Sequence, residues 1–482
     1  AEATSQFLRV SGRYPLTGAG DVNTYQVFAE TFRDLIHPDG RCGFITPTGL
    51  ATDATTAPFF ADSLRTKRLV AFYDFETGPE IWRGIGHNRF RFATSVLTGS
   101  PASDDREAQL AFVLKHPREL DGERVIRISN EDLRSLNPNT GTLPLFRSRR
   151  DAEITIGIYR RHPVLIREGD SEGNPWGLSF RTMFHMTNDS YRFLSAEQLE
   201  AMGADFDGWS WVQGEQRWLP LYEAKMVNLY DARFSTYKNL PTDYEGTALP
   251  RLTDGEHADP WVEPLARYWV DQRAVAEVAS EFTDLPFLLG WRDLTNQGNE
   301  RTTISCLIPI SAVGNTFMLA STKGAAESAS LMMGVMGSLA FDFVARQKLS
   351  ATHLNYFTVK QIAAPTPEVL SLTPSWLNEP LATWLIPRVL ELTYTSHRMT
   401  PYARSLGYDG PPFAWNPQRR ALLRAEIDAA MMHAYGLKRD EVEHVLNSFR
   451  VLRKYEERDF GEFRTKRLVL ESYDRMAEAA SD

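Results

Sequence analysis

Two polar stretches lie on either side of an apolar segment and combine the side-chain types that contact nucleic acids. The first covers residues 292–303 and the second covers residues 341–361. Arg and Lys can neutralise phosphates or reach guanine, and Asn and Gln can pair with the edge of adenine. The predicted DNA contacts are Arg292, Asn296, Asn299, Arg301, Arg346, Lys348, His353, Asn355 and Lys360. The alternative interpretation is a pair of exposed polar loops with ordinary surface charges.

A carboxylate and lysine pattern allows a second chemistry, the metal-dependent cleavage of phosphodiesters. Glu223 and Lys225 follow Asp205 and Asp207 in the chain. In magnesium nucleases two carboxylates hold the metal, and a lysine orients the attacking water. Short patterns of this kind occur often by chance, so a magnesium-dependent nuclease is kept only as an alternative. The histidines show no spacing that predicts a metal site.

The elements that must position these residues begin with alternating helices and strands. Helical spacing of apolar residues predicts helices over 21–36 and 56–67. Short apolar runs predict strands over 42–46, 69–75 and 90–97. Such alternation is typical of a doubly wound α/β sheet, here with antiparallel last strands.

The remainder of the chain changes character twice. From about residue 107 turn signals become frequent and predict a mixed α+β domain, with a Met-rich helix over 325–346 near its end. After residue 365 the pattern predicts helices to the end of the chain, at 420–435, 439–453 and 463–480. We therefore predict three domains, covering residues 1–106, 107–365 and 366–482.

Composition places limits on the class of protein. The chain has 482 residues, 43% of them hydrophobic, and a net charge of −9, which argues against a wholly basic nucleic-acid coat but allows a local basic cleft. Cys42 and Cys306 are too few for a disulfide framework or a thiolate zinc site, which fits the cytoplasm. No apolar run approaches the roughly 18 residues of a membrane span, and no secretion signal is evident, so we expect no membrane partner. The first residue is Ala1, which suggests a processed chain or an excerpt.

Several further segments, together with the two polar stretches, resemble one family in consistent order. They are residues 11–25, 40–49, 136–140, 220–226, 424–429 and 435–437. All are similar to large bacterial adenine-specific DNA methyltransferases, the bifunctional type II restriction-modification proteins and their phage-defence relatives. Each segment is of moderate specificity, and together they cover nearly the whole chain.

The resemblance implies a division of labour along the chain. Residues 1–106 would be the C-terminal part of a Rossmann-like methyltransferase sheet, residues 107–365 a target-recognition domain that grips double-stranded DNA, and residues 366–482 a helical C-terminal region. The whole protein would transfer a methyl group from S-adenosylmethionine to N6 of an adenine flipped out of the duplex. A bacterial cytoplasmic location follows from the same resemblance.

Two parts of that chemistry are missing from this sequence. The glycine-rich loop that binds the cofactor does not occur, and neither does the Asn/Asp-Pro-Pro-aromatic turn that accepts the adenine amine. Residues 137–139 and 174–176 lack the second proline, and residues 410–413 lie in the predicted helical region. We therefore predict no catalytic, cofactor-binding or metal-binding residue in this chain, and we expect S-adenosylmethionine to be bound by an N-terminal remainder of the polypeptide or by a catalytic subunit.

Trp82 is the one residue of the first domain that the resemblance places near the reacting base. In the similar enzymes an aromatic side chain around this position stacks on the flipped base, an interaction worth about 1–3 kcal/mol. The alternative is a partly buried tryptophan that packs under the edge of the sheet. For the whole chain, the alternative function without catalysis is a DNA-specificity module that works with a separate catalytic subunit.

Overall fold

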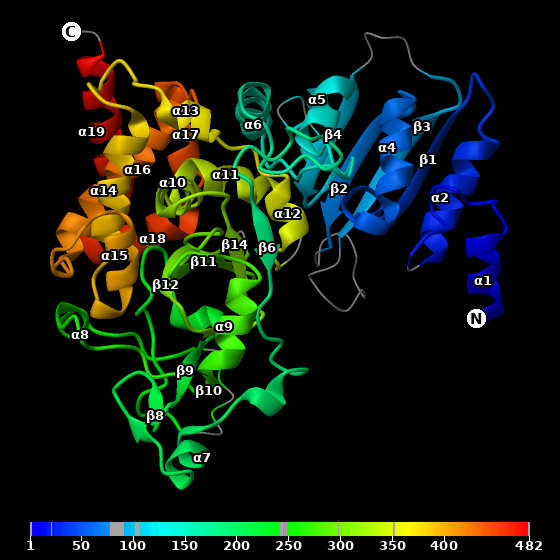
Figure 1. Cartoon of the computed structure of the whole chain (residues 1–482). Helices are drawn as coiled ribbons and strands as arrows, with labels where there is room; N and C mark the ends of the chain where they lie inside the picture. Colours follow the sequence, from blue (N-terminus) through cyan, green and yellow to red (C-terminus); the bar gives the residue numbers. More distant parts are fainter. Residues whose placement is uncertain are drawn as a thin grey trace. The chain divides into compact units, whose positions relative to one another are not determined.

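A computed structural model shows a mixed α/β protein (Figure 1). It describes residues 2–20, 22–77, 91–101, 107–120, 122, 124–241, 244, 246, 248–296, 298–349 and 352–480. The chain divides into two compact units, Ala1–Arg161 and His162–Asp482. Trp82, the predicted base-stacking residue, lies outside the described residues.

The first unit is built on a five-stranded sheet in the order β1-β3-β2-β4-β5. Strand β3 pairs antiparallel with both β1 and β2, so β1 and β2 run parallel with β3 inserted between them. Strand β4 is parallel to β2, and β5 is antiparallel to β4. The strands are β1 (Arg41–Pro47), β2 (Leu69–Glu76), β3 (Arg91–Thr98), β4 (Ala108–Leu114) and β5 (Ile126–Ile128).

The helices of the first unit connect these strands. Helix α2 packs against β1, and the α3–α4 segment links β1 to β2. The helices are α1 (Glu2–Val10), α2 (Thr24–Leu35), α3 (Gly49–Thr52), η1 (Ala54–Thr56), α4 (Ala57–Arg65), η2 (Pro117–Glu119), α5 (Asn130–Leu136) and α6 (Arg149–Arg161). The strands and helices predicted in the first hundred residues are confirmed within a few residues at each end, and the last strands are antiparallel as predicted.

Aromatic side chains form the core of this unit. Phe72 of β2 lies 5.8 Å from Phe60 and 6.2 Å from Phe112 between ring centroids, and Phe112 lies 6.2 Å from Phe146. All four rings are almost completely buried. Because buried aromatic side chains remove large apolar areas from water, they fix helix α4 and the segment that precedes α6 to the sheet.

The first compact unit extends past the boundary predicted at residue 106. Strand β4 follows that boundary in the sequence but pairs with β2, so the sheet continues past it and the compact unit ends only at Arg161. Parallel pairing joins segments that are distant in sequence, and no local signal marks it.

The second unit contains two sheets, as the mixed α+β prediction requires. One has the order β10-β9-β8-β7, with β13 parallel to β9, and the other has the order β12-β11-β14-β6. The strands are β6 (Ser179–Arg181), β7 (Asp205–Phe206), β8 (Trp211–Gln213), β9 (Gln216–Tyr222), β10 (Trp269–Asp271), β11 (Phe287–Arg292), β12 (Ser305–Pro309), β13 (Ala312–Val313) and β14 (Phe317–Ser321).

Helices dominate the rest of the second unit (Figure 1). Those before residue 366 are η3 (Ser190–Arg192), α7 (Ala196–Ala201), η4 (Ala224–Met226), α8 (Asp254–Ala258), α9 (Gln272–Ser280), α10 (Ala326–Gly337), α11 (Leu339–Lys348) and α12 (Tyr356–Lys360). Those after it are α13 (Pro367–Ser371), α14 (Leu381–Thr393), η5 (His397–Met399), α15 (Thr400–Ser405), α16 (Pro417–Ala434), α17 (Arg439–Asn447), α18 (Arg450–Phe460) and α19 (Arg464–Ala479).

The Met-rich segment forms the centre of this unit, and it is two helices, not the one predicted. Helices α10 and α11 meet at Ser338 with a bend of 66°. Nearly every side chain of both is buried, because α10 is apolar on all sides. In the described part of the chain no single helix is long and apolar enough to cross a membrane, although this bent pair meets the test of length and composition.

The predicted third domain is not separate. Helix α14 packs on α10, and helices α16 and α17 pack on α11, so the C-terminal helices share one core with the region before residue 366. The predicted helix over 439–453 is likewise divided, into α17 and α18. Its break falls at residues 448–449, where the buried Phe449 precedes α18.

Candidate functional site

The two polar stretches lie side by side, although about fifty residues separate them in the sequence. Residues after β11 pair with the segment that joins α11 to α12, through a bridge between Leu294 and His353. The Thr295 amide donates to Thr352 O at 3.0 Å, and the Leu354 amide donates to the carbonyl of Asp293 at 2.8 Å. One surface therefore receives side chains from both stretches.

Trp291 fixes the second stretch through a hydrogen bond and an aromatic contact. Its indole N–H donates to Leu354 O at 2.7 Å, and its ring meets Tyr356 edge-on at 5.6 Å between centroids. Tyr356 in turn stacks on Phe180, with ring centroids 5.3 Å apart. Because Trp291 and Phe180 come from strands β11 and β6, the sheet fixes the start of α12.

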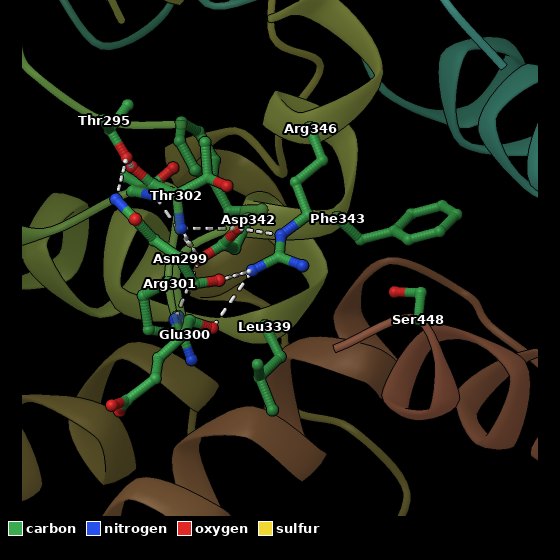
Figure 2. A network of polar contacts seen from close by, with 12 residues as sticks. Thr295, Asn299, Glu300, Arg301, Thr302, Leu339, Asp342, Phe343, Arg346 and Ser448 are labelled. Carbon is green, nitrogen blue, oxygen red and sulfur yellow. Dashed lines mark hydrogen bonds and ion pairs between the residues drawn. The ribbon is translucent and has the colours of Figure 1, made fainter. Parts of the chain in front are cut away.

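Asp342 ties the first stretch to helix α11 (Figure 2). Its side chain is fully buried, and its oxygens accept hydrogen bonds from the backbone amides of Thr302 and Thr303, at 3.0 and 3.3 Å. The Nε atoms of Arg301 and Arg346 lie 2.9 and 3.0 Å from the same carboxylate. Two guanidinium groups and two amides thus compensate the buried negative charge, as a buried ion must be.

The Arg346 guanidinium also binds backbone carbonyls of the first stretch. Its Nη2 donates to the carbonyls of Asn299 and Glu300, both at 3.0 Å, and its Cζ lies 4.1 Å above the ring of Phe449. Burial lowers the pKa of Arg346 against the opposing effect of Asp342. Arg301 also donates to the carbonyl of Gly337 at 2.5 Å, at the end of α10.

Three of the arginines predicted to contact DNA are therefore engaged inside the protein. Arg301 and Arg346 hold the loop to α11, and Arg292 donates to Val227 O and lies 5.5 Å from the ring of Phe234. Burial lowers the pKa of Arg292 to about 10. These placements disfavour the predicted phosphate contacts, because each guanidinium would have to give up its partners inside the protein.

The two lysines are placed differently. Burial lowers the pKa of Lys348 well below its usual value, although the residue as a whole is only partly covered. Lys360 forms an ion pair with Glu168 at 2.8 Å, where both side chains are partly exposed.

Asn296, His353 and Asn355 are the exposed members of the predicted set, and Asn299 is half-buried. The Asn296 and Asn355 side-chain oxygens accept the backbone amides of Gly298 at 2.7 Å and of Thr358 at 3.0 Å. Neither amide NH2 group makes a hydrogen bond to the residues that the structure describes. Each asparagine is thus held through its oxygen and presents two free donors to solvent.

His353 is oriented by a carboxylate. Its Nδ1 lies 2.6 Å from Oδ2 of Asp293, whose side chain is 12% exposed, whereas the side chain of His353 is 52% exposed. A carboxylate partner fixes the ring orientation and places the proton on Nδ1. The other ring nitrogen of His353 makes no hydrogen bond to a residue that the structure describes.

The residues of the nuclease alternative do not form a metal site. Glu223 and Lys225 pair with each other at 3.4 Å, and Tyr237 donates to the other oxygen of Glu223. Asp207 accepts the amides of Trp209 and Ser210 in a turn. Among the described residues there is no group of three or more His, Cys, Asp or Glu side chains that could hold a metal ion.

Sequence reasoning missed the residue that organises the site. Asp342 lies four positions before Arg346, a spacing that places both on one face of a helix and could have indicated the pair. Its contacts with residues 301–303 depend on the packing of α11 against a distant loop. Phe449, which packs against the Arg346 guanidinium, lies about one hundred positions further along the chain. The sequence near the two polar stretches therefore does not predict this contact.

Comparison with known proteins gives a weak likeness to solved structures. No protein-family model matches the sequence, and no curated protein does. The type IIG restriction endonuclease BpuSI aligns with 92% of this chain at 9% identity and a TM-score of 0.29. The type IIL restriction-modification enzyme MmeI, solved in complex with DNA, aligns with 93% at 10% identity and a TM-score of 0.43. The chain spans about half the length of these structures, 53% and 55%, and the scores are too low to define a shared fold or function.

Proposed function

We propose that this chain recognises DNA as part of a site-specific adenine methyltransferase of the restriction-modification or phage-defence kind. The single observation that supports this best is the convergence of the two polar stretches on one surface. The bridge between Leu294 and His353 joins the two stretches, and the exposed residues are Asn296 on the first and His353 and Asn355 on the second. Free amide donors beside a ring nitrogen can read base edges, since asparagine pairs with N6 and N7 of adenine.

Rigid backing makes this surface suitable for reading a sequence. The buried Asp342 network holds the first stretch, and Trp291 holds the second. Specific contacts need donors that are already in place, because ordering a mobile loop on binding costs free energy. In this proposal the buried arginines act as the support of the surface, and the exposed polar side chains make the contacts.

The first unit supports the idea of an incomplete catalytic domain. Among the described residues β1 pairs only with β3, so its other edge is open. Beside that edge Phe28, Leu35 and Ile45 are 56%, 77% and 60% exposed. Open strand edges and exposed apolar groups are normally covered. We propose that the N-terminal remainder of the polypeptide, or a catalytic subunit, adds further strands here.

S-adenosylmethionine and the target adenine would be held mainly by that missing part. The residues present do not fit the cofactor on their own, because the sequence contains neither the glycine-rich loop nor the Pro-Pro-aromatic turn. The cofactor would supply the methyl group that moves to adenine N6. The residues of this chain would bind and orient the duplex, with Trp82 proposed to stack on the flipped base.

A binding experiment tests the recognition role. Selection from a random duplex library should enrich one sequence, and fluorescence anisotropy then gives its Kd at fixed salt. Asn355→Ser keeps an N-cap oxygen for α12 but removes the amide donors. We expect it to weaken binding to the selected site about tenfold, within the roughly 1–3 kcal/mol that a good base contact contributes, and to leave non-specific binding unchanged.

The matched control is Asn188→Ser, which replaces an exposed asparagine outside both stretches. It should bind like the unmodified protein. Failure to enrich any duplex sequence would contradict the recognition role. Equal weakening of specific and non-specific binding by Asn355→Ser would contradict the base contact.

The second candidate is a DNA-specificity module that has no methyltransferase sheet of its own and serves a separate enzyme. The open edge of β1 is compatible with both candidates. Transfer of labelled methyl groups by the complete polypeptide would support the enzyme, and a requirement for a second protein would support the module. In the complete enzyme, Trp82→Ala should reduce methylation more than duplex binding, and equal loss of both would reject the stacking role.

A further inference from the structure

A cavity of about 590 Å³ opens within the second unit, away from the exposed asparagines of the two stretches. Helices α16, α18 and α19 form one side of it, and residues 228–230 and 300–301 form the other. Its volume falls in the range of small-molecule sites, about 300–1,000 Å³. A smaller cavity of about 240 Å³ adjoins it and shares Arg251 and Arg424 as lining residues.

Positive charge without a partner distinguishes this cavity. Arg251, Arg424 and Arg464 all line it. Within the described part of the chain none of their guanidinium groups makes a hydrogen bond or an ion pair. Arg251 and Arg464 only lie over aromatic rings, 5.0 Å from that of Phe234 and 5.1 Å from that of Phe460. Most other arginines of this unit have a carboxylate or carbonyl partner, as Arg301 and Arg458 of the same lining do.

Arg424 lies in the least favourable setting of the three. Arg424 is exposed where it borders the cavity. Burial of its guanidinium among the surrounding residues lowers its pKa and the charge of Arg301 lowers it further, while Asp428 and Glu456 oppose the shift. A guanidinium deprived of water and placed near a second guanidinium is destabilised unless an anion accompanies it.

Four carboxylates also border the cavity, and most have partners. Asp459 pairs with Arg458 at 2.6 Å, Glu456 accepts the hydroxyl and amide of Thr465, and Asp428 accepts the Leu339 amide. Glu300 is the exception: it is exposed and forms no ion pair with a described residue, although Arg251 and Arg424 both act on it electrostatically. Glu300 is therefore the carboxylate of this lining without a hydrogen-bonded or ion-paired partner, and it competes for these two arginines together with Asp428 and Glu456, which act on Arg424.

We propose that this cavity binds the phosphate of a nucleotide, with Arg251 and Arg424 as its principal ligands and Arg464 beside them. Guanidinium groups bind phosphate through paired N–H donors, which suits them better than lysine for this task. Tyr455 and Phe460, both partly exposed on α18, offer apolar surface for the base or sugar. The nucleotide is either free or a unit of a nucleic acid, since the phosphate chemistry is the same.

Two substitutions should change affinity in opposite directions, which a general loss of folding would not do. Arg424→Gln removes a ligand and should weaken binding at least tenfold. Glu300→Gln removes a competing anion and should strengthen binding severalfold. Arg453→Gln is the matched control, because Arg453 lies on the same helix α18 but does not line the cavity and is paired with Glu457. It should change the affinity by less than twofold.

Isothermal titration with ATP and with inorganic pyrophosphate measures the free ligands, and anisotropy with a fluorescent duplex measures nucleic acid. Thermal melting of each variant checks that it is folded. ATP binding with the opposite responses identifies a free nucleotide, and the same responses with duplex alone identify a nucleotide of DNA. If neither ATP, pyrophosphate nor duplex responds to Arg424→Gln and Glu300→Gln in this manner, the proposal is overturned. The Asn355→Ser result is independent, so failure here is distinguishable from failure of the DNA-recognition role.

Discussion

Asp342 shows how one buried charge can organise a surface it does not reach. It touches backbone amides of the first polar stretch and two arginines, and through Arg346 it fixes the carbonyls of Asn299 and Glu300. Each partner compensates part of the cost of burying the others. This network therefore fixes the backbone that carries the exposed side chains of the first stretch.

Removal of this charge should be costly. Asp342→Asn leaves Arg301 and Arg346 buried without a counter-ion, and it turns an amide NH2 toward amide donors. We expect a loss of about 3–5 kcal/mol in the free energy of unfolding, the range for breaking one partner of a buried pair. Urea denaturation followed by circular dichroism measures it. Asp284→Asn, at an exposed position, should stay within about 0.5 kcal/mol of the unmodified protein. A similar small effect for Asp342→Asn would contradict the role of the network.

Asp428 should make stability depend on pH. Burial raises its pKa to about 6, although Arg301 and the Leu339 amide oppose the shift. The folded state therefore holds this proton more tightly than the unfolded state does, so the unfolded chain ionises first as pH rises. Stability is lost between the ordinary carboxyl pKa, about 4, and about 6, and a shift of about two pKa units corresponds to about 3 kcal/mol.

Asp428→Asn removes this ionisation and keeps an oxygen for the Leu339 amide. Its stability relative to the unmodified protein should rise between pH 4 and pH 7 by up to about 3 kcal/mol. Urea denaturation across this range measures the difference between the two proteins. Glu263, whose pKa burial raises to about 7, contributes equally to both and cancels. A difference that does not change with pH would contradict the prediction.

At the scale of elements, the break between α10 and α11 brings Asp342 and Arg346 to the loop. Ser338 ends α10 and caps α11, because its hydroxyl accepts the Phe341 amide at 3.2 Å. Asp428 of α16 accepts the Leu339 amide at 2.6 Å. The first turn of α11 is thus satisfied twice, and this allows it to leave the direction of α10 by 66°.

The cap can be tested by two substitutions at one position. Ser338→Ala should lower the free energy of unfolding by about 1 kcal/mol, whereas Ser338→Gly should cost only a few tenths, because glycine is tolerated at the N-cap. Ser371→Ala, whose hydroxyl is exposed, serves as the control for loss of a serine. Chemical denaturation at one pH suffices for the comparison. Alanine no worse than glycine would show that the hydroxyl does not cap α11.

The sequence was most informative where structure is local. Short apolar runs predicted β1 and β2, and amphipathic spacing predicted α16 and α19. The break at Ser338 was not predicted because the segment is apolar on all sides. Its hydrophobic pattern therefore does not change where the helix changes direction. The extension of the first unit past residue 106 was not predicted because β4 pairs with β2 across at least 38 positions.

The site was predictable as two regions but not as a set of contacts. On composition alone, Arg346 and Asn355 are equally good candidates for DNA contact. In the structure Arg346 is buried against Phe449, whereas Asn355 is exposed. What separates them is a carboxylate on the inner face of α11 and an aromatic residue about one hundred positions away. Composition predicts which side chains can bind DNA, and packing decides which of them are free to do so.

At the scale of the molecule, no sheet among the described residues is shared between the two compact units. All strand pairings of β1–β5 lie within Ala1–Arg161, and those of β6–β14 lie within His162–Asp482. The two polar stretches, the Asp342 network and the cavity all belong to the second unit. The first unit contains the open strand edge and the exposed apolar side chains of α2 and β1.

This division predicts that residues 162–482 fold without the first unit. The fragment should unfold cooperatively with a Tm close to that of the corresponding transition in the full chain, because no strand loses a partner when the first unit is removed. Residues 1–161 alone should associate at micromolar concentrations through the edge of β1 and the apolar groups beside it. Calorimetry and sedimentation velocity measure the two behaviours.

The same fragment locates the phosphate contacts of the proposed DNA interface. The slope of log affinity against log salt concentration reports the number of phosphates neutralised. If the second unit makes all of these contacts, the fragment and the full chain should give the same slope on one duplex, measured by anisotropy at several salt concentrations. A shallower slope for the fragment would assign phosphate contacts to the first unit. Since the net charge of the whole chain is −9, such binding must come from local arginines and lysines and not from the charge of the molecule as a whole.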